Sequence, residues 1–378
     1  MRVAILGSRG YPSTYSGYET LVRHLAPGLR DRGFSVTVYC RATDVPPPPR
    51  ATSDEIDGIS RIWTRGIDGK STSTLSHGFT SIRDAARRRF DAALVLNVAN
   101  GYFLPTLRRA GTPIAVNVDG IEWERDKWNG VGKAVFRRGA SLVARHADEI
   151  IVDSRAIGEY WQRVFARSST FIPYGADVHT NVPRDRLADL GLESGTYVLV
   201  IARIVPENNV GPFLDAVELL DDATPVVVVG SAVGRSALET RLARLASSRP
   251  GFHWLGHVSD QELLRQLRAH CGVYWHGHSV GGTNPSLLEA MGCGAPIVAV
   301  DTVYNREVLG ESGTLAAGIG SVIKHQLEAQ LATDVDDTRR AAAEQERVEA
   351  HYRWCQVYER YGETLGRLID RGLRRDHA

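Results

Sequence analysis

The sequence has few cysteines and no long hydrophobic run, and each absence excludes a class of protein. The four cysteines show no C-x-x-C spacing, which argues against a zinc site and against a disulfide framework. No apolar run approaches the ~20 residues that a membrane-spanning helix needs. The chain begins directly in a strand pattern, MRVAILG, so we expect no signal peptide and a cytoplasmic location.

The common nucleotide-binding fingerprints are also missing. The glycine-rich segment GSRGYPSTYSGYE, residues 7–19, is neither G-x-G-x-x-G nor a Walker loop, so NAD and ATP binding lose support. Glycines in this segment permit close backbone approach, and the start of the helix that follows favours a phosphate or a sugar. Candidates for binding the acceptor or a phosphate here are Gly10, Tyr15, Gly17 and Tyr18.

Apolar strand patterns alternate with amphipathic helical patterns, which is typical of parallel sheets covered by helices. The first half contains five such strands: MRVAILG, FSVTVYC, AALVLNV, TPIAVNV and DEIIVDS. The pattern restarts at Tyr197 with TYVLVIAR, TPVVVVG, FHWLGH, CGVYWH and APIVAVD, with helices predicted over 210–220, 236–247, 261–269 and 285–291. Because 378 residues exceed what one core usually supports, we expect an α/β protein of two doubly wound, Rossmann-like domains.

Charge is unevenly distributed although the net charge is only +1. Residues 1–175 carry 25 Lys and Arg against 17 Asp and Glu, while the rest of the chain is acidic. Arginine clusters at 87–89, 108–109 and 137–138 would suit an anionic membrane surface or an anionic acceptor, and solvated helix faces are the alternative. We expect no nucleic-acid partner.

The stretch HSVGGTNPSLLEAMGCGAPIVAVD, from His278 to Asp301, sets a glycine-rich turn before a short helix and then an apolar strand. Backbone N–H groups and the positive end of a helix dipole bind phosphate, and Glu289, one turn into the helix, is placed to accept from ribose hydroxyls. The alternative is an ordinary helix start capped by Thr or Asn.

Taken in order, these segments resemble the retaining glycosyltransferases of family 4, which have the GT-B fold. SGYETLVRHLAPGLRDRGFSVTVYCR resembles the opening of the acceptor domain, FIPYGAD the entry to the donor domain, and IARIVPENN the segment that binds the donor diphosphate. DGIEWERDKW and GGTNPSLLEAMGCGAPIVA are similar to a bacterial rhamnosyltransferase-like subfamily. The resemblance implies an N-terminal acceptor domain (1–175), a C-terminal donor domain (176–355) and a C-terminal helix (356–378) that packs back on the N-terminal domain.

Site residues carry over unevenly from the family. Arg203 stands where the family places the arginine that holds the diphosphate, but Asn208 replaces the expected lysine. Glu289 matches the second glutamate of the family pair, and Gly281 replaces the first, which in the family contacts sugar hydroxyls. The resemblance therefore implies that the donor sugar is bound by the turn and the helix start, Gly281, Gly282, Thr283, Asn284 and Pro285.

Asp119 stands where the family usually places its active-site histidine, which generally binds the hydroxymethyl end of the sugar. A 6-deoxy donor such as dTDP-rhamnose lacks that hydroxyl, so a 6-deoxy or other non-glucose donor is expected. Asp119 would accept from another hydroxyl or act on the acceptor, and a structural cap is the alternative. Glu122 and Glu124 are candidates for acceptor binding, with solvated surface positions as the alternative.

The implied reaction moves a sugar from a nucleoside diphosphate to a hydroxyl with retention, in the manner of a hexosyltransferase. Catalysis would rest on Arg203, Asn208 and Asp119 without a metal or other cofactor. Expected partners are the nucleotide sugar and a hydroxyl acceptor, including a lipid-linked sugar of cell-envelope polysaccharide synthesis at the inner membrane face. Alternatives are a GT-B epimerase, for which His276 and His278 are candidate bases, and a non-catalytic sugar-nucleotide-binding protein.

Overall fold

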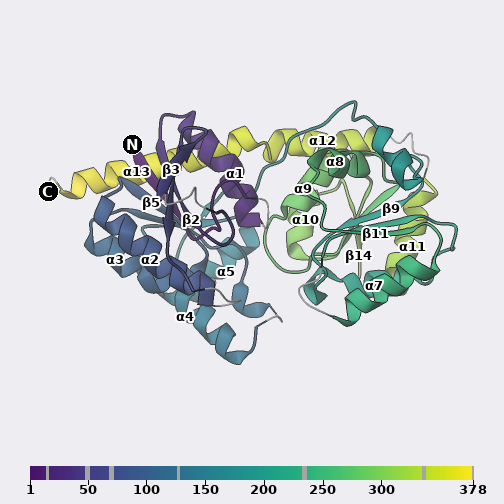
Figure 1. Cartoon of the computed structure of the whole chain (residues 1–378), viewed down its shortest axis with the longest axis horizontal. Helices are drawn as coiled ribbons and strands as arrows, with labels where there is room; N and C mark the ends of the chain where they lie inside the picture. The colour runs from purple at the N-terminus through teal and green to yellow at the C-terminus, as the bar shows by residue number, and fades with distance from the viewer. Residues whose placement is uncertain are drawn as a thin grey trace. The chain divides into compact units, whose positions relative to one another are not determined.

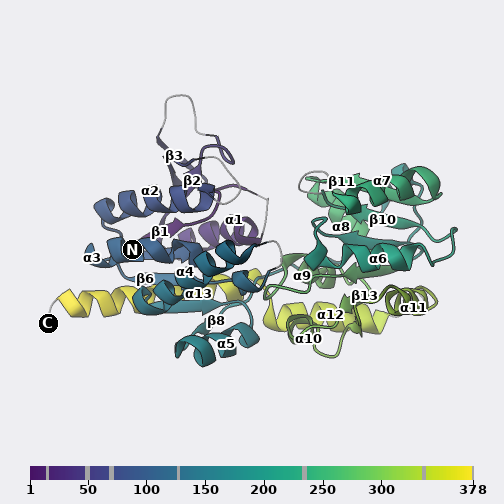
Figure 2. The same ribbon diagram turned by 90° about the horizontal axis from the view of Figure 1, so that it is seen from below.

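The computed structural model describes residues 1–13, 17–46, 52–67, 72–125, 128–231, 236–333 and 338–376. The chain divides into two compact units (Figures 1 and 2). The N-terminal unit joins Met1–Tyr174 to the C-terminal segment Trp354–Ala378, and the C-terminal unit is Gly175–Arg353. Each unit is an α/β structure around its own parallel sheet, as predicted.

The sheet of the N-terminal unit has eight strands in the order β3-β4-β2-β1-β5-β6-β7-β8, and only the β3–β4 pair is antiparallel. Its strands are β1 (Arg2–Leu6), β2 (Ser35–Arg41), β3 (Ser53–Ile56), β4 (Ile59–Thr64), β5 (Ala92–Leu96), β6 (Ile114–Asn117), β7 (Glu149–Val152) and β8 (Thr170–Phe171). Its α-helices are α1 (Gly17–Arg30), α2 (Thr72–Arg88), α3 (Leu104–Arg109), α4 (Gly130–His146), α5 (Arg155–Phe165) and α13 (Trp354–Asp376).

The sheet of the C-terminal unit has six strands in the order β11-β10-β9-β12-β13-β14, all parallel. Its strands are β9 (Val198–Ile201), β10 (Val226–Val229), β11 (Phe252–Gly256), β12 (Val273–His276), β13 (Ile297–Val300) and β14 (Thr314–Ala316). Its α-helices are α6 (Val210–Val217), α7 (Ala237–Ser248), α8 (Gln261–Ala269), α9 (Pro285–Gly292), α10 (Val303–Leu309), α11 (Gly320–Leu331) and α12 (Thr338–His351).

All ten predicted strands are present. They could be predicted because strands buried on both faces of a parallel sheet are continuous apolar runs in the sequence. All four residues of β6, β10, β12 and β13 are buried. Four strands escaped prediction: the β3–β4 hairpin and the short edge strands β8 and β14. The polar residues of β3, SDEI, are mostly exposed at the sheet edge, so they carry no apolar signal.

Helix α13 packs on α1 within the N-terminal unit, and Figure 1 shows it running along that unit. The His24 ring stacks on the Trp354 ring with centroids 4.1 Å apart. Gly28 makes room for the neighbouring tyrosine, because a Cβ there would lie 2.4 Å from the Tyr358 ring. These contacts fix α13 against α1.

His77 of α2 is a buried titratable group in this unit, with 1% of its surface exposed. Its Nε2 lies 3.1 Å from the carbonyl oxygen of Cys40 on β2. Burial, together with the charge of Arg41, lowers the pKa of His77 from 6.5 to about 4. The folded N-terminal unit therefore holds a neutral imidazole at neutral pH.

The unfolding midpoint in urea should fall as the pH drops from about 6.5 towards about 4, since the unfolded chain then binds a proton that the folded chain refuses. His77→Gln keeps a donor for the Cys40 carbonyl and cannot titrate, so its midpoint should fall less over that range. Equal falls in the two proteins would contradict the assignment.

Candidate active site

The loop after β9 presents Arg203 and is held by two asparagines. The Arg203 side chain is exposed, and within the described part of the chain its guanidinium forms no ion pair. The Asn208 amide nitrogen donates to the carbonyl oxygen of Arg203 at 2.9 Å, with only 2% of Asn208 exposed. The amide of Asn208 therefore has a structural contact inside the loop, and its predicted contact with the diphosphate stays a prediction.

This loop is tied to the loop after the neighbouring strand β12. The Asn209 amide donates to the Gly277 carbonyl oxygen at 2.7 Å. Both the backbone N–H and the hydroxyl of Ser279 donate to the carbonyl oxygen of Glu207, at 3.0 and 2.8 Å. A Cβ on Gly277 would lie 2.2 Å from the carbonyl oxygen of Asn208, so only glycine permits this approach. Arg203 and the turn that follows β12 therefore share one edge of the sheet.

The glycine-rich turn leads into α9, and Asn284 caps the N-terminus of this helix. Gly281 has a φ of +107°, a conformation that side-chain-bearing residues rarely adopt, so the family's glutamate would be strained here. The Asn284 side chain accepts from the Ser286 N–H at 3.0 Å, as the capping alternative predicted, and Pro285 has no N–H. An anion at this point would therefore interact with the helix dipole and the turn rather than with the first helical amides.

Glu289, the predicted ribose ligand, forms an ion pair with Arg268 of α8 through its Oε2. The Arg268 side chain is 6% exposed, whereas that of Glu289 is 30% exposed. One carboxylate oxygen thus serves a buried cation, and the exposed part of the group stays open to a ligand. No local pattern in the sequence indicates this pair, because its members are 21 residues apart on different helices.

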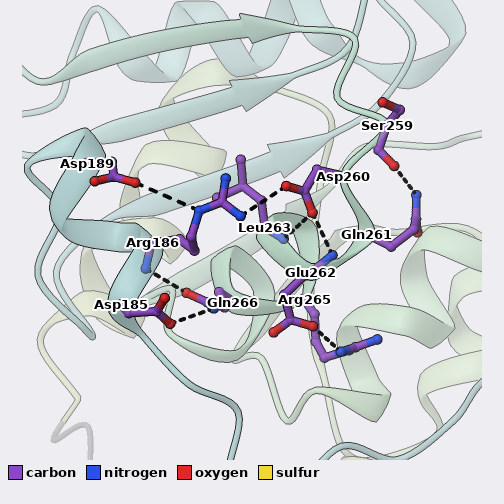
Figure 3. A network of polar contacts seen from close by, with 10 residues as sticks. All are labelled: Asp185, Arg186, Asp189, Ser259, Asp260, Gln261, Glu262, Leu263, Arg265 and Gln266. Carbon is purple, nitrogen blue, oxygen red and sulfur yellow. Dashed lines mark hydrogen bonds and ion pairs between the residues drawn. The ribbon is translucent and has the colours of Figure 1, made fainter.

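Helix α8, which carries Arg268, is anchored at its N-terminal end (Figure 3). Asp260 accepts from the N–H groups of Glu262 and Leu263 and from the Arg186 guanidinium, the last at 3.0 Å. Gln266 accepts from the Arg186 N–H and donates to Asp185, both at 3.0 Å. These contacts hold the helix that places Arg268 beside Glu289.

In the N-terminal unit, Asp119 stands two residues beyond the end of β6. Its φ of +51° is in the left-handed region, and its N–H donates to the Asn117 side-chain oxygen at 3.0 Å. Its carboxylate lies 3.8 Å from the Arg125 guanidinium, and its side chain is 22% exposed. Asp119 is thus held in an uncommon backbone conformation with part of its carboxylate accessible.

Glu122 is buried, so the alternative of a solvated surface position does not hold for it. Its carboxylate lies 2.9 Å from Arg125 Nε and accepts from Trp128 Nε1 at 3.1 Å. The 3₁₀ turn Glu122–Glu124 folds the side chain inward and leaves Glu124 exposed. Glu122 therefore positions Arg125, and a contact between Glu122 and an acceptor stays a prediction.

Tyr18, at the start of α1, lies close to the same carboxylates. Its hydroxyl is 3.4 Å from the Asn117 carbonyl oxygen, and burial, followed by Asp119, raises the pKa of Tyr18 well above its usual value. The Tyr174 hydroxyl faces the first residue of this helix, 3.2 Å from where a Cβ on Gly17 would lie. The structure thus brings Gly17, Tyr18 and Asp119 to one edge of the N-terminal sheet.

The glycine at position 10 has an internal packing role. Gly10, with a φ of +131°, packs against Cys40, and a Cβ would lie 2.8 Å from the Cys40 Sγ. Its glycine is thus explained by internal packing rather than by a ligand. Tyr15 lies outside the described residues.

Sequence reasoning missed three residues at this edge. Asp153 directly follows β7 at the position next to Asp119, since Asn117 and Ile151 are paired in the sheet. It is 1% exposed, and a carboxylate straight after a buried strand was the signal that could have found it. Tyr174 is buried, and burial, then Asp119, raises its pKa well above the usual value. Tyr361 comes from α13 and had no local signal.

His276 and His278, the candidate bases, stack with ring centroids 4.6 Å apart. His276 is 1% exposed, and burial, with the charge of His278, lowers its pKa well below 6.5. Both of its ring nitrogens are enclosed. His276 is therefore in no position to take a proton from a substrate.

Among the described residues, no cluster of three or more His, Cys, Asp or Glu side chains has an arrangement suited to a metal ion. In the same part of the chain, no helix has the length and apolar character needed to cross a membrane.

Two family models match the chain, one in each half. A model described as a glycosyl transferase 4-like domain matches residues 16–175, and one described as glycosyl transferases group 1 matches residues 195–352. The second range contains the loop of Arg203, the glycine-rich turn and Glu289. The first contains Gly17, Tyr18 and Asp119.

Curated relatives are distant. The chain is 26% identical over 261 residues to the GDP-mannose-dependent alpha-(1-6)-phosphatidylinositol dimannoside mannosyltransferase of Mycobacterium tuberculosis (strain ATCC 25177 / H37Ra), covering 65% of this chain and 68% of that protein. It is 27% identical over 124 residues to O-antigen chain mannosyltransferase B of Escherichia coli, covering 32% of each. Both are named as transferases of mannose.

Solved structures share the fold over the whole chain. Sucrose-phosphate synthase from Thermosynechococcus elongatus aligns with a TM-score of 0.82 at 18% identity, covering 98% of this chain and 99% of that one. HepE from Anabaena in complex with UDP aligns with a TM-score of 0.73 at 18% identity, covering 97% and 100%. At this identity the likeness establishes two Rossmann-like domains and nothing finer.

Removing Glu289 should destabilise the protein even without a ligand. Breaking a buried ion pair from one side costs about 3–5 kcal/mol, and the partial exposure of Glu289 places Glu289→Ala near the lower end. Urea unfolding measures this loss. Glu262→Ala, which breaks the exposed pair with Arg265, is the matched control and should cost less than about 1 kcal/mol. Equal, small losses would show that Arg268 does not depend on Glu289.

Proposed function

The chain belongs to the GT-B glycosyltransferases that combine a glycosyl transferase 4-like domain with a group 1 domain, and we propose that it moves a sugar from a nucleoside diphosphate to a hydroxyl with retention. The observation that carries the proposal is Arg203. It is an exposed guanidinium without an ion pair among the described residues, on a loop that three hydrogen bonds fix beside the glycine-rich turn.

Arg203 holds the diphosphate and stabilises the charge that develops as it departs. A guanidinium donates two parallel hydrogen bonds to phosphate oxygens, and its charge is constant at every working pH. Because Asn208 replaces a lysine, Arg203 supplies the positive charge of this loop, and the dipole of α9 adds to it. The open part of the Glu289 carboxylate binds ribose hydroxyls.

The donor is a 6-deoxy or other non-glucose nucleotide sugar, with dTDP-rhamnose as the first choice. Gly281 removes the carboxylate that would contact sugar hydroxyls, and Asp119 replaces the histidine that serves a hydroxymethyl group. The first distant relative is named as GDP-mannose-dependent, which makes GDP-mannose the second donor to test. Asp119 accepts from a hydroxyl of the sugar or of the acceptor.

The acceptor is a hydroxyl of a lipid-linked sugar in cell-envelope polysaccharide synthesis, used at an anionic membrane surface. Support comes from three arginine clusters of the N-terminal unit, Arg87–Arg89, Arg108–Arg109 and Arg137–Arg138, all of which are exposed. Their attraction to anionic vesicles would weaken as salt rises. Salt-independent binding, or none, would favour a soluble acceptor.

Epimerisation on the same fold is the weaker alternative. It needs a base that reaches a carbon-bound proton of the sugar. The two histidines proposed for that task are stacked on each other, and both nitrogens of His276 are enclosed. Sugar transfer needs residues that bind the donor and stabilise the leaving diphosphate. The exposed guanidinium of Arg203 supports that role.

Mass-spectrometric detection of released nucleoside diphosphate and of glycosylated product, over UDP-, GDP- and dTDP-sugars with mixed acceptors, tests the proposal. Turnover of one donor with sugar on an added acceptor is expected. Rearrangement of the sugar on its nucleotide, without transfer, would establish the epimerase instead.

Arg203→Ala should lower turnover by about 10²–10³, as removal of one preorganised donor to a developing charge does elsewhere. Its thermal unfolding midpoint should stay unchanged, because the side chain is exposed. Arg244→Ala removes another exposed arginine of the C-terminal unit, one paired with Glu218 on the surface, and is the matched control. Near wild-type turnover in Arg203→Ala would contradict the proposed role.

A further inference from the structure

A buried chain of two hydrogen bonds connects the C-terminal helix α13 to Asp119. The Asn117 side-chain nitrogen donates to the Tyr361 hydroxyl at 2.6 Å, across 244 positions of sequence. The Asn117 side-chain oxygen accepts from the Asp119 N–H at 3.0 Å. Asn117 and Tyr361 are 1% and 0% exposed, so water does not compete for these bonds.

The two bonds together fix which way the Asn117 amide faces. If the amide turned over, its oxygen would meet the Tyr361 hydroxyl and its NH₂ would meet the Asp119 N–H, which would leave two donors in contact. Asp119 is in turn held at a φ of +51°, a backbone conformation that residues other than glycine adopt at a cost of about 1 kcal/mol or more. The Asn117 side chain therefore holds Asp119 in its uncommon conformation.

Tyr361 is itself immobile. Its helix is fixed by the Trp354–His24 stack, by Tyr358 on Gly28 and by the Arg32 guanidinium, which donates to the Cys355 carbonyl oxygen at 3.2 Å. Burial raises the pKa of Tyr361 above its ordinary value, so the hydroxyl stays neutral at every working pH. The hydrogen bond to Asn117 thus persists wherever the protein is folded.

The hydrogen-bonded series Tyr361–Asn117–Asp119, here called the relay, ends close to Tyr18. Besides burial, Asp119 is the leading cause of the raised pKa of both Tyr18 and Tyr174. Tyr18 also contacts the carbonyl oxygen of Asn117. A shift of the Asn117 amide would therefore move Asp119 relative to both tyrosines.

We propose that Tyr361, acting through Asn117, is a positioning residue that sets the place of the Asp119 carboxylate for sugar transfer. The inference rests on the proposed function of Asp119. Tyr361 touches no substrate, and its hydroxyl acts on the geometry of a group that does. Displacing a reacting or binding group by about 1 Å can cost ~100-fold in rate, so losing one hydroxyl on α13 has a measurable effect on transfer.

Tyr361→Phe removes only the hydroxyl and keeps the buried ring. Its kcat should fall by about tenfold to a hundredfold, with the KM for the donor changed far less. Tyr197→Phe is the matched control, because Tyr197 is also 0% exposed and its hydroxyl donates to the Leu267 carbonyl oxygen at 2.7 Å. The two variants should lose similar stability, and the control should keep its kcat. Equal kcat values in the two variants would overturn the proposal.

A double-mutant cycle separates positioning from general loosening. In the Asp119→Asn background, Tyr361→Phe should lower kcat by less than twofold, because the group that Tyr361 positions has already lost its charge. Asparagine tolerates the left-handed backbone, so Asp119→Asn keeps the local fold. Independent, multiplying losses from the two changes would show that Tyr361 does not act through Asp119.

Hydrogen exchange of the Asp119 amide tests the relay without any assay of transfer. In the wild type this N–H should be protected by Asn117, and Tyr361→Phe, but not Tyr197→Phe, should speed its exchange by about tenfold or more. An unprotected amide in the wild type, or unchanged exchange in Tyr361→Phe, would overturn the relay even if transfer is confirmed. Faster exchange in a protein that transfers no sugar would uphold the relay and count against the proposed function instead.

Discussion

The candidate donor site depends on the hydrogen bonds that join the loop after β9 to the loop after β12. These two strands are neighbours in a parallel sheet, so their carboxyl ends meet at one edge, where open α/β sheets bind ligands. Asn209 and Ser279 close the contact, and Gly277 allows it. Since this contact fixes the loop backbone, Arg203 is held beside the glycine-rich turn with its guanidinium exposed.

In the N-terminal unit, the side chain of Asn117 likewise holds a loop in place. Asn117 holds Asp119 at the end of β6, and its own orientation is set by a tyrosine that arrives from the far end of the chain. Each unit thus uses a side-chain amide, Asn209 or Asn117, to shape a loop that carries a charged side chain, which is exposed for Arg203 and partly exposed for Asp119. A neutral amide suits this task, because it donates and accepts at once without the desolvation cost of a charge.

The features that depend on residues close together in sequence could be predicted. Buried parallel strands are continuous apolar runs, and Asn284 caps α9 as a capping residue before proline suggests. The polar edge strand β3 carries no such signal, and the burial of Glu122 could not be predicted because it depends on a 3₁₀ turn and on Trp128. The Arg268–Glu289 pair and the Tyr361–Asn117 bond join residues far apart in sequence, so only the fold reveals them.

A crystal structure of the chain with the nucleoside diphosphate of its donor tests the central claim most directly. The account predicts that diphosphate oxygens lie within about 2.7–3.2 Å of the Arg203 guanidinium, next to the turn Gly281–Asn284, with ribose hydroxyls at Glu289. A diphosphate bound at another part of the molecule, or one that leaves Arg203 without a contact, would contradict it.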